Sequence, residues 1–316
     1  MKQVLLPIIL ILAITFTITG CKNTAQKQNT DTIPDSASQN IPLDTVATAN
    51  TLGDTLTTNR ITYDKSQDST IKSIIRLDYP TGNDSVSIAV KAFLARQLAS
   101  LYLPQTNGED AYIYKYPVYE GSIFHGQQMV GHYGKGTLQY LSDSQKEMLK
   151  DMGDSADHIP FLNNETTLRK EEETADYITY RITRDTYLGG AHGSYLYYCV
   201  NISKHTLRPI EQTIDTTRLK ALQPLLRKGI CRYLKECGEN VTNTNLNTYL
   251  FLPENGLIPL PAFTPWLSKE GVNFVYQQYE IAPYALGLVS FTIPYKQIRT
   301  YFCKELNAHR SLERKR

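Results

Sequence analysis

The chain has 316 residues, of which 41% are hydrophobic and 20% are charged. This composition is typical of a globular protein with an adequate core, and it excludes a disordered chain and a largely membrane-embedded one. The formal net charge is +2, from 33 basic and 31 acidic residues, so no excess of positive charge favours a nucleic-acid partner.

The first 21 residues have the pattern of a bacterial lipoprotein signal. Lys2 precedes an apolar run over residues 4–16, and the small residue Gly20 stands directly before Cys21. A secretory signal combines a basic start, an apolar core and a small residue at the cleavage site. We therefore expect residues 1–20 to be a signal peptide and Cys21 to carry the lipid, such as palmitate. The protein would then be anchored to a bacterial membrane in the cell envelope, with its folded domains outside the cytoplasm.

The segment over residues 21–59 is composed mainly of Thr, Asn, Asp, Gln and Ser. Such a sequence has too little apolar surface to offset the entropy lost on folding. We predict that it is a flexible linker between the lipid and the folded domains.

The first folded domain is expected over residues 60–174. Polar and apolar residues alternate from Ile71 to Tyr79, which predicts a strand. Asp84 is a candidate N-cap for an amphipathic helix that continues to Pro104. Further strands are predicted over residues 112–119 and 129–140. Strands mixed with a helix in this order indicate an α+β domain.

A second α+β domain is expected over residues 175–305, followed by a basic tail over 306–316. Its strands are predicted over residues 177–187, 195–202, 272–277 and 287–293, and its helices over 224–237 and 295–302. Pro224 is expected in the first turn of its helix, where a missing N–H costs little. The predicted fold class is thus α+β, with two small mixed domains that each contain an antiparallel sheet with packed helices.

Four cysteines follow Cys21, all in the C-terminal half: Cys199, Cys231, Cys237 and Cys303. An even number of thiols in an exported chain is compatible with two disulfides, for which three pairings exist. Free buried thiols are the alternative, because cysteine is among the most buried residue types. No Cys-x-x-Cys or similar ligand spacing occurs, so neither a metal nor another cofactor is expected.

Tyrosine is enriched, with 22 residues against 9 Phe and 1 Trp. Several tyrosines alternate along the chain, as at Tyr195 and Tyr197, and such alternation is typical of strands. Tyrosine suits a half-buried sheet face because its ring is apolar and its hydroxyl can reach water. The alternative interpretation is a tyrosine-lined contact surface for a protein or a glycan.

Two separated motifs carry a family resemblance. The first is Gly189-Gly190-Ala191-His192-Gly193, and the second is Tyr279-Glu280-Ile281-Ala282-Pro283-Tyr284. In this order they resemble the extracytoplasmic domain of unknown function found in the RsiV anti-sigma factor and beside peptidoglycan deacetylase domains. The resemblance covers roughly residues 175–303, and residues 60–170 more weakly resemble the α+β domain that precedes it in that family.

The resemblance implies an α+β ectodomain that binds a ligand without catalysis, because RsiV captures lysozyme. This chain departs from RsiV in beginning with a lipoprotein signal instead of a cytoplasmic segment and a membrane helix. We therefore expect a binding module whose partner is lysozyme, peptidoglycan or another envelope protein. The candidate ligand-binding residues are Gly189, Gly190, His192, Gly193, Tyr279, Glu280 and Tyr284.

Two other functions stay open. His192 either lies close to a ligand or fixes a turn through its backbone contacts, and it has no evident nucleophile or metal partner in the sequence. Glu280 and Asp185 could serve as the paired carboxylates of a glycosidase acting on the cell wall. A purely structural envelope lipoprotein is the last alternative. We expect no catalytic residues and no enzyme activity.

Overall fold

The computed structural model describes residues 55–102, 117–153, 159–304 and 306, which belong to one compact unit spanning residues 47–316. The predicted signal peptide, Cys21 and most of the predicted linker lie outside the described residues. So do most of the strand predicted over residues 112–119 and most of the basic tail. Among the helices that the structure describes, none is both long and apolar enough to cross a membrane.

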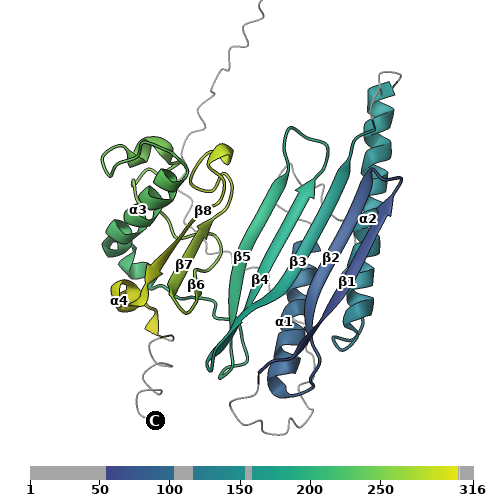
Figure 1. Cartoon of the computed structure of the whole chain (residues 1–316), viewed down its shortest axis with the longest axis horizontal. Helices are drawn as coiled ribbons and strands as arrows, with labels where there is room; N and C mark the ends of the chain where they lie inside the picture. Colours follow the sequence, from purple (N-terminus) through teal and green to yellow (C-terminus); the bar gives the residue numbers. More distant parts are fainter. Residues whose placement is uncertain (1–54, 103–116, 154–158, 305, 307–316) are drawn as a thin grey trace, which may run out of the picture. The chain divides into compact units, whose positions relative to one another are not determined.

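A five-stranded sheet forms the first half of the fold, with the spatial order β1-β2-β3-β4-β5 (Figure 1). Its strands are β1 (Thr58–Gln67), β2 (Ile71–Pro80), β3 (Leu162–Glu173), β4 (Tyr177–Tyr187) and β5 (Ser194–Ser203). All neighbouring pairs are antiparallel except β2 and β3, which are parallel. The α+β class is confirmed, but the first sheet is mixed and not purely antiparallel. The long connection between β2 and β3, which contains two helices, permits this parallel pairing.

This sheet crosses the position at which we expected one domain to end and the next to begin. Strands β4 and β5 follow residue 174 in the sequence but pair in register with β3. The second sheet starts only at Trp266, and it consists of β6 (Trp266–Leu267), β7 (Gly271–Tyr276) and β8 (Val289–Pro294), all antiparallel.

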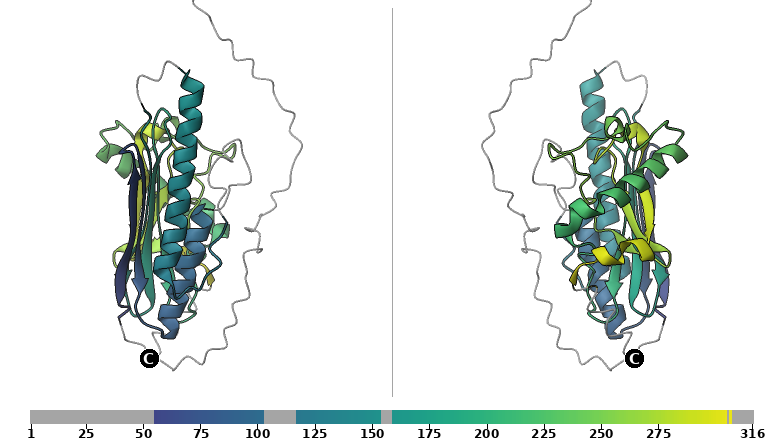
Figure 2. Two further views of the ribbon diagram at one scale, coloured as in Figure 1. Left: turned by 90° about the vertical axis from the view of Figure 1, so that its right-hand side faces the viewer. Right: turned by 90° about the vertical axis from the view of Figure 1, so that its left-hand side faces the viewer.

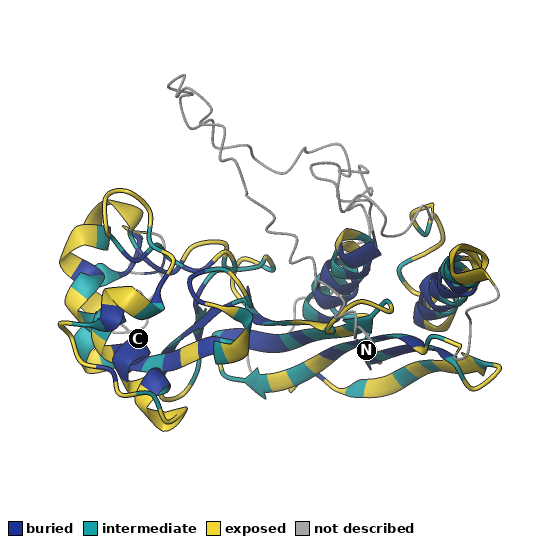
Figure 3. Cartoon of the chain, turned by 90° about the horizontal axis from the view of Figure 1, so that it is seen from above, coloured by how far each residue is buried: buried dark blue, intermediate teal, exposed yellow. Residues whose placement is uncertain are grey.

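Helices α1 (Ser85–Tyr102) and α2 (Gly126–Met152) lie on the same face of the five-stranded sheet (Figure 2). The predicted N-cap of α1 is confirmed, because the Asp84 carboxylate accepts the backbone N–H of Ser87 at 3.0 Å and its hydroxyl at 2.6 Å. The buried residues of both helices face the sheet (Figure 3).

The strand predicted over residues 129–140 is wrong, because this segment lies inside α2. Its buried residues Met129, Tyr133 and Thr137 recur every four positions, which is the spacing of one helix face. The glycines that suggested a bend lie against the sheet instead. A Cβ on Gly134 would overlap the Tyr63 ring, so this glycine lets the helix backbone approach β1 closely.

Helix α3 (Leu219–Glu236) packs on the three-stranded sheet, and their apolar side chains form a common core. The helix begins five residues before Pro224, so the prediction that this proline lies in the first turn is wrong. The chain ends its described part with the short helix α4 (Tyr295–Ile298) and a 3-10 turn over Arg299–Tyr301.

The tyrosines divide between two environments. Tyr180 and Tyr276 are fully buried, as the sheet-packing interpretation predicts. Tyr195 and Tyr279 are instead 39% and 57% exposed. These exposed rings lie at or beside the two sequence motifs.

Candidate functional site

The glycine-rich motif is the turn that joins β4 to β5. Gly189 has a φ of +83°, a left-handed conformation that favours glycine. A Cβ on Gly193 would lie only 3.1 Å from the carbonyl oxygen of Thr186. The shape of the turn therefore favours glycine at both positions, and the turn presents His192 at its exposed end.

His192 contacts the second motif directly, although the two are 87 residues apart. Its Nδ1 lies 3.0 Å from the carbonyl oxygen of Gly193, and its Nε2 lies 3.3 Å from the hydroxyl of Tyr279. A carbonyl oxygen only accepts hydrogen bonds, so Nδ1 must carry a proton. In the neutral ring Nε2 then accepts the hydroxyl proton of Tyr279.

Tyr284 completes the cluster from the same loop as Tyr279. Its ring stacks on His192 with the centroids 3.9 Å apart, and its hydroxyl donates to the Gly193 carbonyl at 3.0 Å. Tyr279 lies 5.6 Å from Tyr284, measured between ring centroids. We call the three rings of His192, Tyr279 and Tyr284 the aromatic cluster.

Glu280 shapes the loop that carries these tyrosines. Its two carboxylate oxygens accept the backbone N–H of Ala262 at 2.6 Å and of Gln277 at 2.7 Å. Burial raises the pKa of Glu280 above its ordinary value, and the two backbone hydrogen bonds only partly oppose this effect. The carboxylate thus closes the loop at Gln277 and ties it to the segment before β6 at Ala262.

Tyr279 occupies the most unusual backbone position of the loop. Its φ is +65°, a left-handed conformation that is a genuine outlier for a bulky residue. The same side chain is 57% exposed, so burial of its ring does not explain why a tyrosine stands there. Backbone strain of this kind persists where the surrounding structure enforces it, and it is concentrated at functional sites.

Two glutamines hold this loop against the edge of β5. The Gln277 side chain accepts the N–H of Tyr197 at 3.2 Å and donates to its carbonyl at 2.8 Å. The Gln278 side chain accepts the N–H of Tyr195 at 3.1 Å. These side-chain amides form hydrogen bonds with backbone groups of β5 that a further strand would otherwise bind. They also fix the distance between the two motifs.

The structure brings together four of the seven candidate ligand-binding residues: His192, Gly193, Tyr279 and Tyr284. The carbonyl oxygen of Gly190 accepts a hydrogen bond from the hydroxyl of Tyr187, and Gly189 lies against Met148 of α2. The sequence analysis missed Gln277 and Gln278. The only feature of the sequence that could have pointed to these two residues is that two amide side chains stand directly before the second motif.

Asp185, the other carboxylate considered for catalysis, is exposed on β4 opposite Tyr195. Within the described ranges, no group of three or more His, Cys, Asp or Glu side chains is arranged to hold a metal ion. The four cysteines of the C-terminal half are free thiols in the structure, and all except Cys237 are buried. Burial raises the pKa of Cys199 to about 12, so this thiol stays protonated.

Comparison with known proteins assigns part of the chain to a family. Residues 213–296 match the profile of the family described as "Protein of unknown function (DUF3298)". This range contains α3, the three-stranded sheet and the loop with Tyr279, but not the glycine-rich turn. No curated protein matches the chain significantly.

Two solved structures share the fold. A DUF3298 family member from Bacteroides fragilis is 18% identical, with a TM-score of 0.57, and the alignment covers 79% of this chain and 94% of that one. A DUF3298 family protein from Pseudomonas aeruginosa is 14% identical, with a TM-score of 0.53 and coverage of 81% and 98%. The chain therefore carries a DUF3298 domain of unknown function in its C-terminal part and has the fold of structurally characterised members of that family.

Proposed function

We propose that the protein is a lipid-anchored, non-catalytic binding module of the cell envelope, and that the aromatic cluster is its ligand-contact surface. The observation that carries this proposal is Tyr279, whose large ring is 57% exposed on a left-handed backbone position. Neither burial of the ring nor the backbone conformation favours a tyrosine there, whereas contact with a partner would.

The cluster is also held in place before any ligand arrives. The ring of Tyr284 is fixed by its stack on His192 and by its hydrogen bond to Gly193. Preorganised side chains lose less entropy on binding, which raises affinity for a given contact area. Tyrosine is moreover one of the residue types that most often dominate the energy of protein interfaces.

The contacts of the polar groups support binding over acid–base catalysis. Both oxygens of Glu280 already accept backbone N–H groups. Both ring nitrogens of His192 lie within hydrogen-bond distance of protein oxygens. A general acid or base needs a free position from which it can reach a substrate proton.

Lysozyme is the first partner to test, because the RsiV resemblance implies it. The membrane anchor rests on the lipoprotein signal that ends at Cys21. Replacement of Cys21 by Ser should abolish incorporation of a labelled fatty acid in growing bacteria. Labelling that persists in the variant would refute the anchor.

Calorimetric titration of the purified protein with lysozyme tests the binding function. We expect saturable binding that Tyr279→Ala weakens by about tenfold or more, which is typical of a truncated interface hot spot. Phe124→Ala is the matched control, since Phe124 is 50% exposed, lies two residues before α2 and should not contribute.

A second titration with soluble peptidoglycan fragments distinguishes a glycan ligand from a protein ligand. If peptidoglycan fragments bind and Tyr279→Ala weakens their binding to the same extent, the aromatic cluster is still the contact surface, but its ligand is a glycan. No binding of either ligand would contradict both versions of the proposal, as would an equal effect of the Tyr279 and Phe124 variants.

A further inference from the structure

Helix α3 concentrates the positive charge of the chain. It contains five basic residues and one acidic residue, whereas the whole chain has a formal net charge of only +2. Its apolar face is packed on the three-stranded sheet. Gly229 allows this close packing, because a Cβ at that position would overlap the Phe291 ring.

Three of the basic residues lie on one exposed face of α3: Lys228, Arg232 and Lys235. Their spacing of four and then three residues places them side by side along the helix. At 1.5 Å of rise per residue, the row extends over about 10 Å.

The row borders a surface cavity of about 600 Å³ between α3 and the loop at residues 242–243. All three basic side chains line this cavity, together with Glu236 as the one acidic residue and Asn243 on the opposite wall. The lining therefore includes three basic residues and one acidic residue, and the surface that these residues expose to the cavity is mainly that of their apolar stems.

The opposite wall is fixed by hydrogen bonds. Arg227 donates to the carbonyl of Asn243 and to the side chain of Asn247, both at 2.9 Å. The Asn243 amide oxygen lies 3.5 Å from the Cys231 sulfur, which can donate to it. This contact leaves the Asn243 NH₂ group as a donor.

The basic groups are only partly neutralised. Arg232 Nε lies 4.0 Å from the Glu236 carboxylate, and its Nη2 donates to the Thr292 carbonyl at 3.3 Å. Neither Lys228 nor Lys235 forms an ion pair with any residue in the described part of the chain. The cavity thus retains a local excess of positive charge.

We propose that this α3 groove binds a ligand with clustered phosphate groups. The guanidinium of Arg232 can donate to phosphate oxygens from the N–H groups that its contacts with Glu236 and Thr292 leave over, and the two lysines act as flexible point charges on either side. A row of about 10 Å is long enough for two or three adjacent phosphate groups. The shared chemistry fits both a soluble oligophosphate and a phosphate-bearing lipid headgroup.

Two triple variants test the proposal on the purified protein. Lys228→Gln, Arg232→Gln and Lys235→Gln remove the row on α3. The control replaces Lys135, Lys146 and Lys150 on α2 with Gln, which removes the same charge from exposed helical positions. The control is matched in position as well, because Lys150 and Lys235 each lie in the last turn of their helix.

Titration with tripolyphosphate is the first measurement. We expect saturable one-to-one binding whose dissociation constant rises about tenfold or more in the α3 variant, since charge-assisted hydrogen bonds are lost. The same constant should change less than about twofold in the α2 variant, because long-range charge effects are screened by salt.

Sedimentation with vesicles of phosphatidylglycerol or of phosphatidylcholine is the second measurement. Binding only to the anionic vesicles, reduced in the α3 variant alone, would identify a lipid headgroup as the source of the phosphate. Binding of tripolyphosphate without vesicle binding would identify a soluble ligand. The proposal is overturned if neither probe binds, or if both variants lose binding equally.

Discussion

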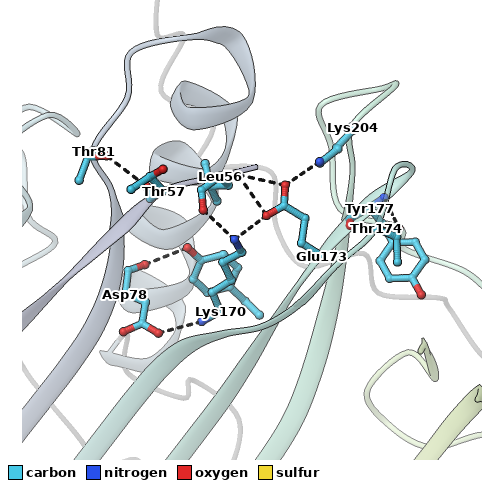
Figure 4. Close-up of polar contacts among 10 residues, drawn as sticks. Leu56, Thr57, Asp78, Thr81, Lys170, Glu173, Thr174, Tyr177 and Lys204 are labelled. Carbon is cyan, nitrogen blue, oxygen red and sulfur yellow. Dashed lines mark hydrogen bonds and ion pairs between the residues drawn. The ribbon is translucent and has the colours of Figure 1, made fainter. Parts of the chain in front are cut away.

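The carboxylate of Glu173 accepts the backbone N–H of Leu56 at 3.0 and 3.1 Å, across 117 residues of sequence. Figure 4 shows that Lys170 and Lys204 converge on the same carboxylate, at 2.5 and 2.6 Å. The Lys170 ammonium also donates to the carbonyl of Leu56 at 2.6 Å. The Glu173 side chain is only 10% exposed, so these groups form a largely buried clamp on Leu56, near the start of the described residues.

Replacement of Glu173 by Gln should lower the free energy of unfolding by about 3 kcal/mol, because two largely buried lysines, 17% and 11% exposed, lose their counter-charge. The midpoint of urea unfolding measures this loss. Glu171→Gln is the control, since Glu171 forms a more exposed ion pair with Arg181 at 3.4 Å and should cost less than about 1 kcal/mol. Equal losses in the two variants would contradict the role of the clamp.

The same clamp should make stability depend on pH. Burial acts to raise the pKa of Glu173, but hydrogen bonds from Lys170, Lys204 and Leu56 outweigh it, so the pKa lies below its ordinary value of 4.5. A carboxylate with a lowered pKa binds fewer protons in the folded state, so its contribution is complete above pH 4.5. That contribution is lost as the pH falls through the lowered pKa.

Unfolding of the wild-type protein and of Glu173→Gln should therefore be compared along an acid series. The difference in stability between them should shrink once the pH drops below 4.5. A difference that stays constant into strongly acidic solution would count against an ionised Glu173.

Two glycines of α2 should respond to alanine in opposite directions. Gly134→Ala would force its Cβ into the Tyr63 ring and should destabilise the protein by about 1–3 kcal/mol. Gly131→Ala meets nothing within 4 Å, so it should raise stability by up to about 1 kcal/mol through helix propensity alone. Thermal unfolding of both variants checks the prediction, and a stabilising Gly134→Ala would refute the close approach of α2 to β1.

The left-handed backbone of Tyr279 should distinguish Asn from Val at that position. Asn tolerates a positive φ whereas a β-branched residue does not, so Val should be less stable than Asn by about 1 kcal/mol or more. Both variants remove the ring and should lose ligand affinity alike. Urea unfolding measures the difference, and equal stabilities would argue against strain at this residue.

The side chain of Gln277 should stabilise the protein more than that of its neighbour Gln278. Gln277→Ala removes two hydrogen bonds to the backbone of Tyr197 and should cost about 2 kcal/mol. Gln278→Ala removes one exposed bond to Tyr195 and should cost less than about 1 kcal/mol. Comparable losses would mean that the loop is held mainly by other contacts.

Strands and helices with a regular local pattern could be predicted from the sequence. The alternation from Ile71 identified β2, the strand predicted over residues 177–187 is β4, and Asp84 identified the start of α1. Helix α2 could not be identified in this way. Its glycines lower the local helix propensity, and it is stabilised by burial of Met129, Tyr133 and other residues against the sheet.

The candidate site was accessible to sequence reasoning only in part. Both motifs were found, but the contact between His192 and Tyr279 depends on how two sheets meet, and no local pattern encodes that. Glu280 was considered as a catalytic group because it could form, with Asp185, the carboxylate pair of a glycosidase. Its actual partners are the backbone groups of Ala262 and Gln277, which only the folded loop brings within reach.

The Glu173 clamp also determines where mechanical tension would enter the protein. Leu56 precedes β1, Glu173 ends β3 and Lys204 follows β5, so the clamp joins the first, third and fifth strands at one end of the sheet. A pull on the chain ahead of Leu56 would therefore be shared across the width of the sheet. Without the clamp, the same pull would peel the edge strand β1 away from β2 one hydrogen bond at a time.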